Sequence, residues 1–124
     1  MKKRLLPLLI LVLISPVYAE TPEEADSIVN VTSGELRELE AMHAEAQRRI
    51  AAGQIREAVS LYWEIILREP DDDAAYTNLG NLYLVLGDND RAKDAFRNAL
   101  DINSENEAAQ AGFLKITHPD EFPN

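Results

Sequence analysis

The sequence predicts an all-α fold, a right-handed helical solenoid of two antiparallel helix pairs followed by a C-terminal capping helix. Two observations support this fold class. Residue types recur at an interval of 34 positions, so that Gly53 returns as Gly87 and Tyr62 returns as Phe96. Around these positions apolar residues recur every three or four places, as they do in amphipathic helices. A repeat of this length is typical of stacked helix pairs, each of which buries its apolar face against its neighbours.

The second copy of the repeat carries the more complete pattern, from Tyr76 through Leu79 and Gly80 to Leu100. This pattern resembles the tetratricopeptide repeat, in which aromatic, leucine, glycine and alanine positions have a fixed order. The resemblance places two repeats at about 39–72 and 73–106. The signature positions of the two copies are Ala46, Gly53, Ala58, Tyr62, Pro70, Tyr76, Leu79, Gly80, Tyr83, Gly87, Ala92, Phe96 and Ala99.

Each signature residue has a physical role in such a fold. Small residues such as Ala58 and Ala92 let two helix backbones approach, whereas a larger side chain would overpack the crossing. Gly53 and Gly87 end the first helix of each pair, because a left-handed backbone is cheap only for glycine. The opening helix of the first copy departs from the pattern, with Glu45 in place of leucine. Terminal repeats of a solenoid are commonly atypical in this way.

The N-terminal 19 residues have the pattern of a secretory signal peptide. Three basic residues precede an apolar run from Leu5 to Ile14, and small residues at Val17 and Ala19 fit a cleavage site after Ala19. The apolar run is shorter than the roughly 20 residues that span a bilayer. We therefore expect a periplasmic or secreted product without a stable membrane anchor after cleavage. An uncleaved anchor is the alternative.

The helix boundaries follow from local signals. Residues 20–31 are acidic and lack a clear period, which predicts a linker or a disordered arm. Thr32 and Glu35 form a capping box that predicts the start of the first helix and of a domain over 32–117. The remaining helices are expected at about 54–68, 72–86, 89–102 and 104–117. Ser104 and Glu107 form the capping box of the last of these, and residues 118–124 form a tail.

Composition and charge restrict the possible partners. The chain has 12 basic and 22 acidic residues, a formal net charge of −10, and no cysteine. The electrostatic field of this negative charge repels nucleic acid and anionic lipid surfaces. The acidic excess serves solubility or, as an alternative, attracts a cationic partner.

The sequence lacks the residue patterns that catalysis requires. Its two histidines, His43 and His118, lie far apart, and it has neither a cysteine nucleophile nor a glycine-rich phosphate loop. The acidic run Asp71–Asp73 is explained by the preference of helix N-termini for negative charge, so no metal site is expected. Trp63 is expected to pack at the junction of the repeats rather than to stack on a ligand. We expect neither enzymatic activity nor a cofactor.

The resemblance implies a protein-binding function. In tetratricopeptide domains the first helix of each pair lines a concave face that receives peptides or extended segments. The residues predicted to line this groove are His43, Gln47, Ile50, Thr77, Asn78, Asn81, Leu84 and Lys115. The chain is thus predicted to be an exported adaptor that binds a protein or peptide. Self-assembly, by stacking through the terminal helices, is the alternative.

Overall fold

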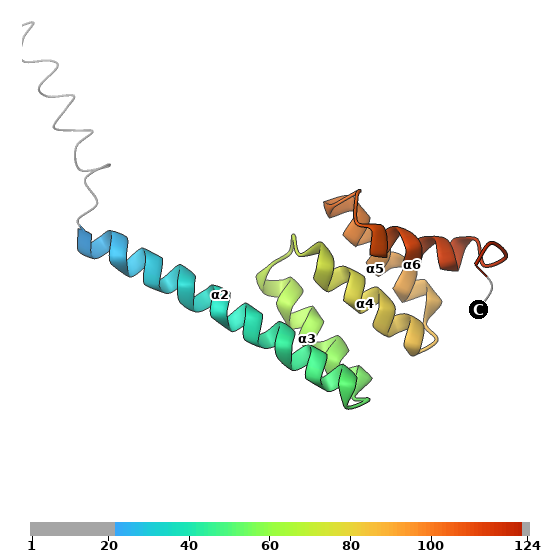
Figure 1. Ribbon diagram of the computed structural model, residues 1–124, viewed down its shortest axis with the longest axis horizontal. Helices are drawn as coiled ribbons and strands as arrows, with labels where there is room; N and C mark the ends of the chain where they lie inside the picture. Colours follow the sequence, from blue (N-terminus) through green and yellow to red (C-terminus); the bar gives the residue numbers. More distant parts are fainter. Residues whose placement is uncertain (1–21, 123–124) are drawn as a thin grey trace, which may run out of the picture. The chain divides into compact units, whose positions relative to one another are not determined.

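The computed structural model describes residues 22–122, which form five helices joined by short turns (Figure 1). The helices are α2 (Pro22–Ala51), α3 (Ile55–Arg68), α4 (Asp73–Val85), α5 (Asn89–Ile102) and α6 (Glu107–Thr117). The chain divides into two units, with the boundary within α2 between Glu38 and Leu39. In the part of the chain described here, no helix combines the length and the apolar character that a membrane span requires.

The start of the first helix is a correction to the sequence prediction. Residues 22–31 continue α2, so the helix begins at Pro22 rather than at the predicted capping box of Thr32 and Glu35. A proline at the first helical position, followed by Glu23 and Glu24, is itself a helix-start signal. The predicted linker is therefore helical from residue 22 onward. The predicted signal peptide over 1–19 lies outside the described residues.

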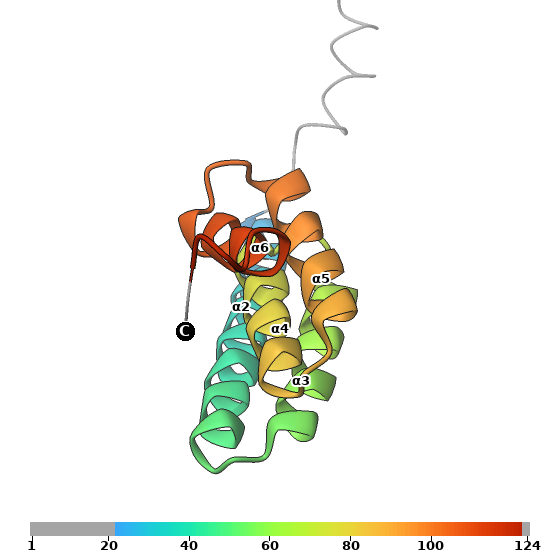
Figure 2. The ribbon, with the colours of Figure 1, turned by 90° about the vertical axis from the view of Figure 1, so that its right-hand side faces the viewer.

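The unit that begins at Leu39 is an all-helical repeat, as predicted. Helix α4 packs against α3 and α5, and α6 packs against both α4 and α5. Within this unit, the part of α2 from Leu39 onward lies in one layer with α4, and α3 and α5 lie in the other (Figure 2). The largest fully buried side chains are Tyr62, Ile65, Leu79 and Phe96. The small signature residues Ala46, Ala58, Ala92 and Ala99 are also fully buried among them.

The two repeated glycines end helices as the sequence predicts. Gly53 and Gly87 have φ angles of 74° and 76°, in the left-handed region that favours glycine. After α2, the amide of Gly53 donates to the carbonyl oxygen of Ile50 at 2.9 Å, and the amide of Gln54 donates to that of Arg49 at 2.8 Å. After α4, the amides of Gly87 and Asp88 make the same pair of hydrogen bonds, to the carbonyl oxygens of Leu84 and Tyr83. Both turns are Schellman motifs, which satisfy carbonyl groups at the helix end.

The start of α6 is a second correction. The helix begins at Glu107, and its cap is Asn106 rather than Ser104. The Oδ1 atom of Asn106 accepts a hydrogen bond from the amide of Ala109 at 2.9 Å. Its Nδ2 atom donates to Asp73 Oδ2 at 2.7 Å and to Thr77 Oγ1 at 2.9 Å, both near the start of α4. These two bonds couple the cap of α6 to α4.

Phe96 occupies the crossing of three helices. It projects from α5 and is fully buried. A Cβ atom added to Gly80 of α4 would lie 2.6 Å from Phe96 Cε1, and one added to Gly112 of α6 would collide with the same ring. The ring therefore lies against bare backbone on both neighbouring helices. Gly80 was predicted from the repeat signature, whereas Gly112 was not part of it.

Candidate functional site

The predicted groove residues of α4 divide between its surface and its core. Asn81 is exposed, whereas Asn78 and Leu84 are half-buried. Asn81 lies two residues from both Leu79 and Tyr83, and hence on the opposite side of the helix from the residues that face α3 and α5. Asn81 is thus available to a partner on the side of α4 that faces away from the α3–α5 layer.

Thr77 is a correction to the predicted groove. Its side chain is only 6% exposed. Its Oγ1 atom donates to the carbonyl oxygen of Asp73 at 2.8 Å and accepts from Asn106. A buried hydroxyl needs such partners because an unpaired polar group in the interior is costly. Thr77 therefore joins α4 to α6 and is not a contact for a partner.

The groove residues of α2 are partly engaged within the protein. His43 Nε2 lies 2.9 Å from Asp72 Oδ2, and its ring packs edge-on against Tyr62 at a centroid distance of 5.9 Å. Gln47 Nε2 donates to the Tyr62 hydroxyl at 2.8 Å. Burial raises the pKa of that hydroxyl, an effect that the Gln47 bond opposes and the Asp72 charge reinforces. His43 and Gln47 therefore fix α2 to the rest of the repeat, while Gln47 keeps an exposed surface.

The polar residues of the degenerate first helix pair with one another. Glu45 Oε1 accepts from Arg49 Nε at 2.6 Å, and Glu45 Oε2 accepts from Arg48 Nε at 2.9 Å. These hydrogen bonds lower the pKa of the Glu45 carboxyl. The tetratricopeptide pattern places leucine at position 45 and tyrosine at position 49, so an ion pair on α2 replaces an apolar contact at the end of the repeat.

Two predicted groove residues meet in a hollow between α4 and α6. Leu84 and Lys115 both line a cavity of about 540 Å³. Two further lining residues, Val85 and Phe122, expose large apolar surfaces to solvent. The complete lining is Leu84, Val85, Asn89, Lys115, Ile116, Pro119 and Phe122. Of the other predicted residues, Ile50 is half-buried on α2 and does not reach this hollow.

The sequence prediction misses part of this hollow because it assigns residues 118–124 to a tail. Pro119 and Phe122 instead form one of its walls. The available signal was Phe122 itself, a large apolar residue among acidic ones. Together the side chains of the hollow offer apolar contact, one ammonium group and one carboxamide. These side chains can bind a peptide. They do not include a nucleophile paired with a general base.

The acidic residues before α4 act in capping and hydrogen bonding. Asp72 Oδ1 accepts from the amide of Ala75 at 2.9 Å, and Asp73 Oδ2 accepts from Asn103 and Asn106. Among residues 33–122, whose side chains the structure describes, no group of three or more histidine, cysteine or acidic side chains is placed to hold a metal ion.

Comparison with known proteins identifies one repeat and a similar fold. The tetratricopeptide repeat family pattern matches residues 74–106, which contain nearly all of α4 and the whole of α5. A solved tetratricopeptide repeat domain protein from Salinibacter ruber is similar in fold, with 24% identity and a TM-score of 0.60. That similarity covers 65% of this chain and 98% of the other.

Residues 74–106 therefore form a tetratricopeptide repeat, and the fold is that of a tetratricopeptide repeat domain. No curated protein sequence matches it. Tetratricopeptide repeat folds generally act as non-catalytic scaffolds that bind other proteins, because stacked helix pairs create an extended binding surface. This chain presents two such pairs and the additional helix α6.

Proposed function

We propose that this protein is an adaptor that binds a segment of a partner protein along α2 and α4 and into the hollow beside α6. The observation that carries the proposal is the meeting of Leu84 and Lys115 in one hollow with the exposed apolar side chains Val85 and Phe122. Exposed apolar surface gathered in a concavity is characteristic of a binding site.

The chemistry of this surface suits an extended segment. Asn81 and Gln47 carry amide groups that can donate to and accept from a partner backbone. Lys115 can donate to a carbonyl or carboxylate oxygen, while Leu84 and Val85 receive an apolar side chain. The hydrogen bonds orient the segment, and burial of apolar area supplies most of the favourable free energy.

Replacing Asn81 and Lys115 together by alanine should weaken binding about tenfold or more, since each substitution removes a hydrogen bond to the partner. The probe is a peptide selected from a random displayed library with the wild-type protein and measured by fluorescence anisotropy. The helicity and melting temperature should change little because both side chains are exposed.

The matched control replaces Ser60 and Arg56 by alanine. These residues are also one neutral and one cationic exposed side chain, but they lie on α3, in the other layer. The control should bind the selected peptide as wild type does. Loss of binding in the control, with normal binding by the Asn81 and Lys115 variant, would place the working surface elsewhere. Self-association that increases with concentration and is lost in the Asn81 and Lys115 variant would favour the stacking alternative.

We further propose that the adaptor is exported, a proposal supported by the signal pattern of residues 1–19. N-terminal sequencing of the protein from its native host should find Glu20 as the first residue. Replacing Ala19 by arginine should block this processing because the peptidase requires a small residue there, whereas the same change at Tyr18 should be tolerated. Recovery of the wild-type chain with Met1 intact would contradict export with cleavage.

A further inference from the structure

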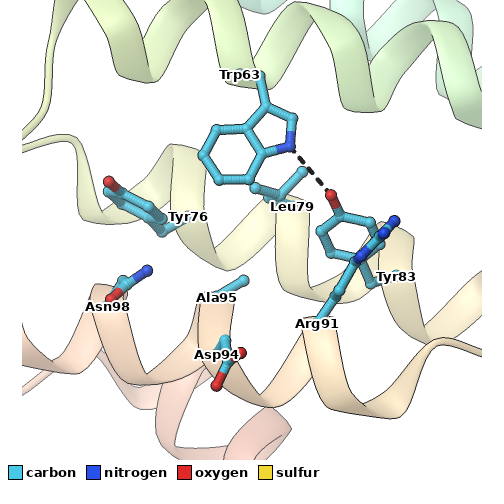
Figure 3. A pocket seen from close by; sticks show the side chains of 8 residues that line it. All are labelled: Trp63, Tyr76, Leu79, Tyr83, Arg91, Asp94, Ala95 and Asn98. Carbon is cyan, nitrogen blue, oxygen red and sulfur yellow. Dashed lines mark hydrogen bonds between the residues drawn. The ribbon is translucent and has the colours of Figure 1, made fainter.

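A second cavity lies on the other side of α4, between α3 and α5 (Figure 3). Its volume is about 350 Å³. The walls include Trp63 of α3 and the carboxylate and carboxamide of Asp94 and Asn98 on α5, and the floor includes Tyr76 and Leu79 of α4. It shares no lining residue with the hollow beside α6. The two are therefore separate candidate sites.

The indole of Trp63 is held in place with much of its surface uncovered. Its Nε1 atom donates to the hydroxyl of Tyr83 at 3.0 Å, yet the residue remains 43% exposed. Figure 3 shows the indole above the cavity with its N–H group directed toward Tyr83, while Tyr76 and Asn98 lie toward the other end. Trp63 thus packs at the repeat junction, as predicted, and also leaves an aromatic surface open to a ligand.

The cavity already contains one contact between a guanidinium group and an aromatic ring. Arg91 Cζ lies 5.8 Å from the centroid of the Tyr83 ring, and Arg91 also forms an exposed ion pair with Asp88 at 3.5 Å. Arg91 lies at the Tyr83 end of the cavity, away from Tyr76 and Asn98 (Figure 3). Away from Arg91, the lining offers the rings of Trp63 and Tyr76 and the carboxamide of Asn98. The carboxylate of Asp94 lies on α5 between Asn98 and Arg91.

We propose that the end of the cavity away from Arg91 binds an arginine side chain presented by a protein partner. The face of a tryptophan ring attracts a guanidinium group more strongly than the faces of other aromatic residues do. The planar guanidinium can stack on Trp63 while its N–H groups donate to Asp94 and Asn98. This surface is additional to the groove proposed above.

Charge complementarity favours a cation over an apolar occupant. The side chain of Asp94 is 70% exposed, and its ion pair with Arg97 is long, at 3.4 Å. Such a pair contributes little, so the carboxylate can accept hydrogen bonds from an incoming guanidinium. The formal net charge of −10 also attracts a cationic segment over longer distances.

The test uses Trp63 as its own reporter, because it is the only tryptophan in the chain. The full protein is titrated with a blocked Gly-Ser-Arg-Ser-Gly peptide and with versions that carry citrulline or leucine in place of arginine. Citrulline has nearly the shape of arginine without its charge. We expect the tryptophan emission to change with the arginine peptide, which should bind about fivefold or more tightly than the citrulline peptide.

Variants of α5 assign the effect to the cavity. Asp94→Asn should remove most of the preference for arginine over citrulline. The matched control, Asp90→Asn, removes the same charge from an exposed position on α5 outside the cavity and should keep the preference. Arg97→Ala should strengthen arginine binding only slightly, because the Arg97–Asp94 ion pair is weak.

Several results would overturn the proposal. Tighter binding of the leucine peptide would identify an apolar site, and tighter binding of free arginine than of the blocked peptide would identify a small-molecule site. No change in emission at peptide concentrations of tens of millimolar would exclude arginine binding at the cavity. An emission change that depends on protein concentration alone would identify a second copy of the chain as the occupant. If Asp94→Asn and Asp90→Asn lost the preference for arginine equally, that preference would come from the overall negative charge of the protein and not from the cavity.

Discussion

Replacing Phe96 by alanine should lower the free energy of unfolding by about 3–5 kcal/mol, as expected for a fully buried aromatic residue that leaves a cavity behind. The ring lies between the bare backbones of Gly80 and Gly112, so its loss removes contacts between α5 and both of its neighbours. Chemical denaturation followed by circular dichroism measures the change. The control Leu67→Ala, at a residue 81% exposed, should change stability by less than about 0.5 kcal/mol.

A double-mutant cycle at Gly80 tests the geometry of this crossing even if Phe96→Ala does not fold. Alanine is favoured over glycine inside a helix by about 1 kcal/mol. In the wild-type protein, however, the new methyl group would meet the Phe96 ring, so Gly80→Ala should be destabilising. In a Phe96→Leu background much of the ring is absent, and the same change should cost less or become stabilising. Equal effects in both backgrounds would show that the ring does not contact Gly80.

The second large effect is expected at Asn106. Its side chain caps α6 and donates two hydrogen bonds to α4. Loss of a cap costs about 1 kcal/mol and each lost hydrogen bond about another 1 kcal/mol, so Asn106→Ala should destabilise the protein by about 2–3 kcal/mol. The melting temperature and the denaturation midpoint measure this effect.

Ser104→Ala is the matched control for this prediction, since Ser104 is the cap that local sequence signals favoured. Its side chain is exposed, and only its backbone carbonyl oxygen accepts a hydrogen bond, from Gln110 Nε2 at 2.7 Å. The alanine variant should therefore retain wild-type stability within about 0.5 kcal/mol. If Ser104→Ala lost more stability than Asn106→Ala, the result would favour the predicted capping box of Ser104 and Glu107 over the Asn106 cap.

The capping of α6 illustrates why some local predictions fail. Ser104 with Glu107 satisfies the capping-box pattern, but Asn106 also has the side chain of a good cap. The choice between them depends on Asp73 and Thr77, which lie about 30 residues earlier and accept hydrogen bonds from Asn106 and not from Ser104. The helix start at Pro22 differs, because its signal was present in the sequence and was outweighed by the capping box at Thr32.

The candidate binding surfaces were predictable only in part. Asn81, Leu84 and Lys115 keep accessible or half-buried surfaces, as the repeat register implied, whereas Thr77 is enclosed by its bonds to Asp73 and Asn106. The repeat register indicates which side of a helix a residue occupies, but not whether a neighbouring helix covers it. Phe122 joined the hollow for the same reason, since the path of the chain after α6 brings it beside Lys115.

The sequence by itself determined the all-helical repeat fold, the order of helices α3 to α6 and the turns at Gly53 and Gly87, because a periodic apolar pattern and a left-handed glycine act through neighbours within a few residues. Only the tertiary structure decided that Asn106 caps α6, that Gly112 borders Phe96, and that Trp63 opens onto a cavity beside Asp94. Each of these depends on which side chains from distant helices face one another. Such contacts arise from packing three-dimensional surfaces, and no periodicity along one helix specifies them.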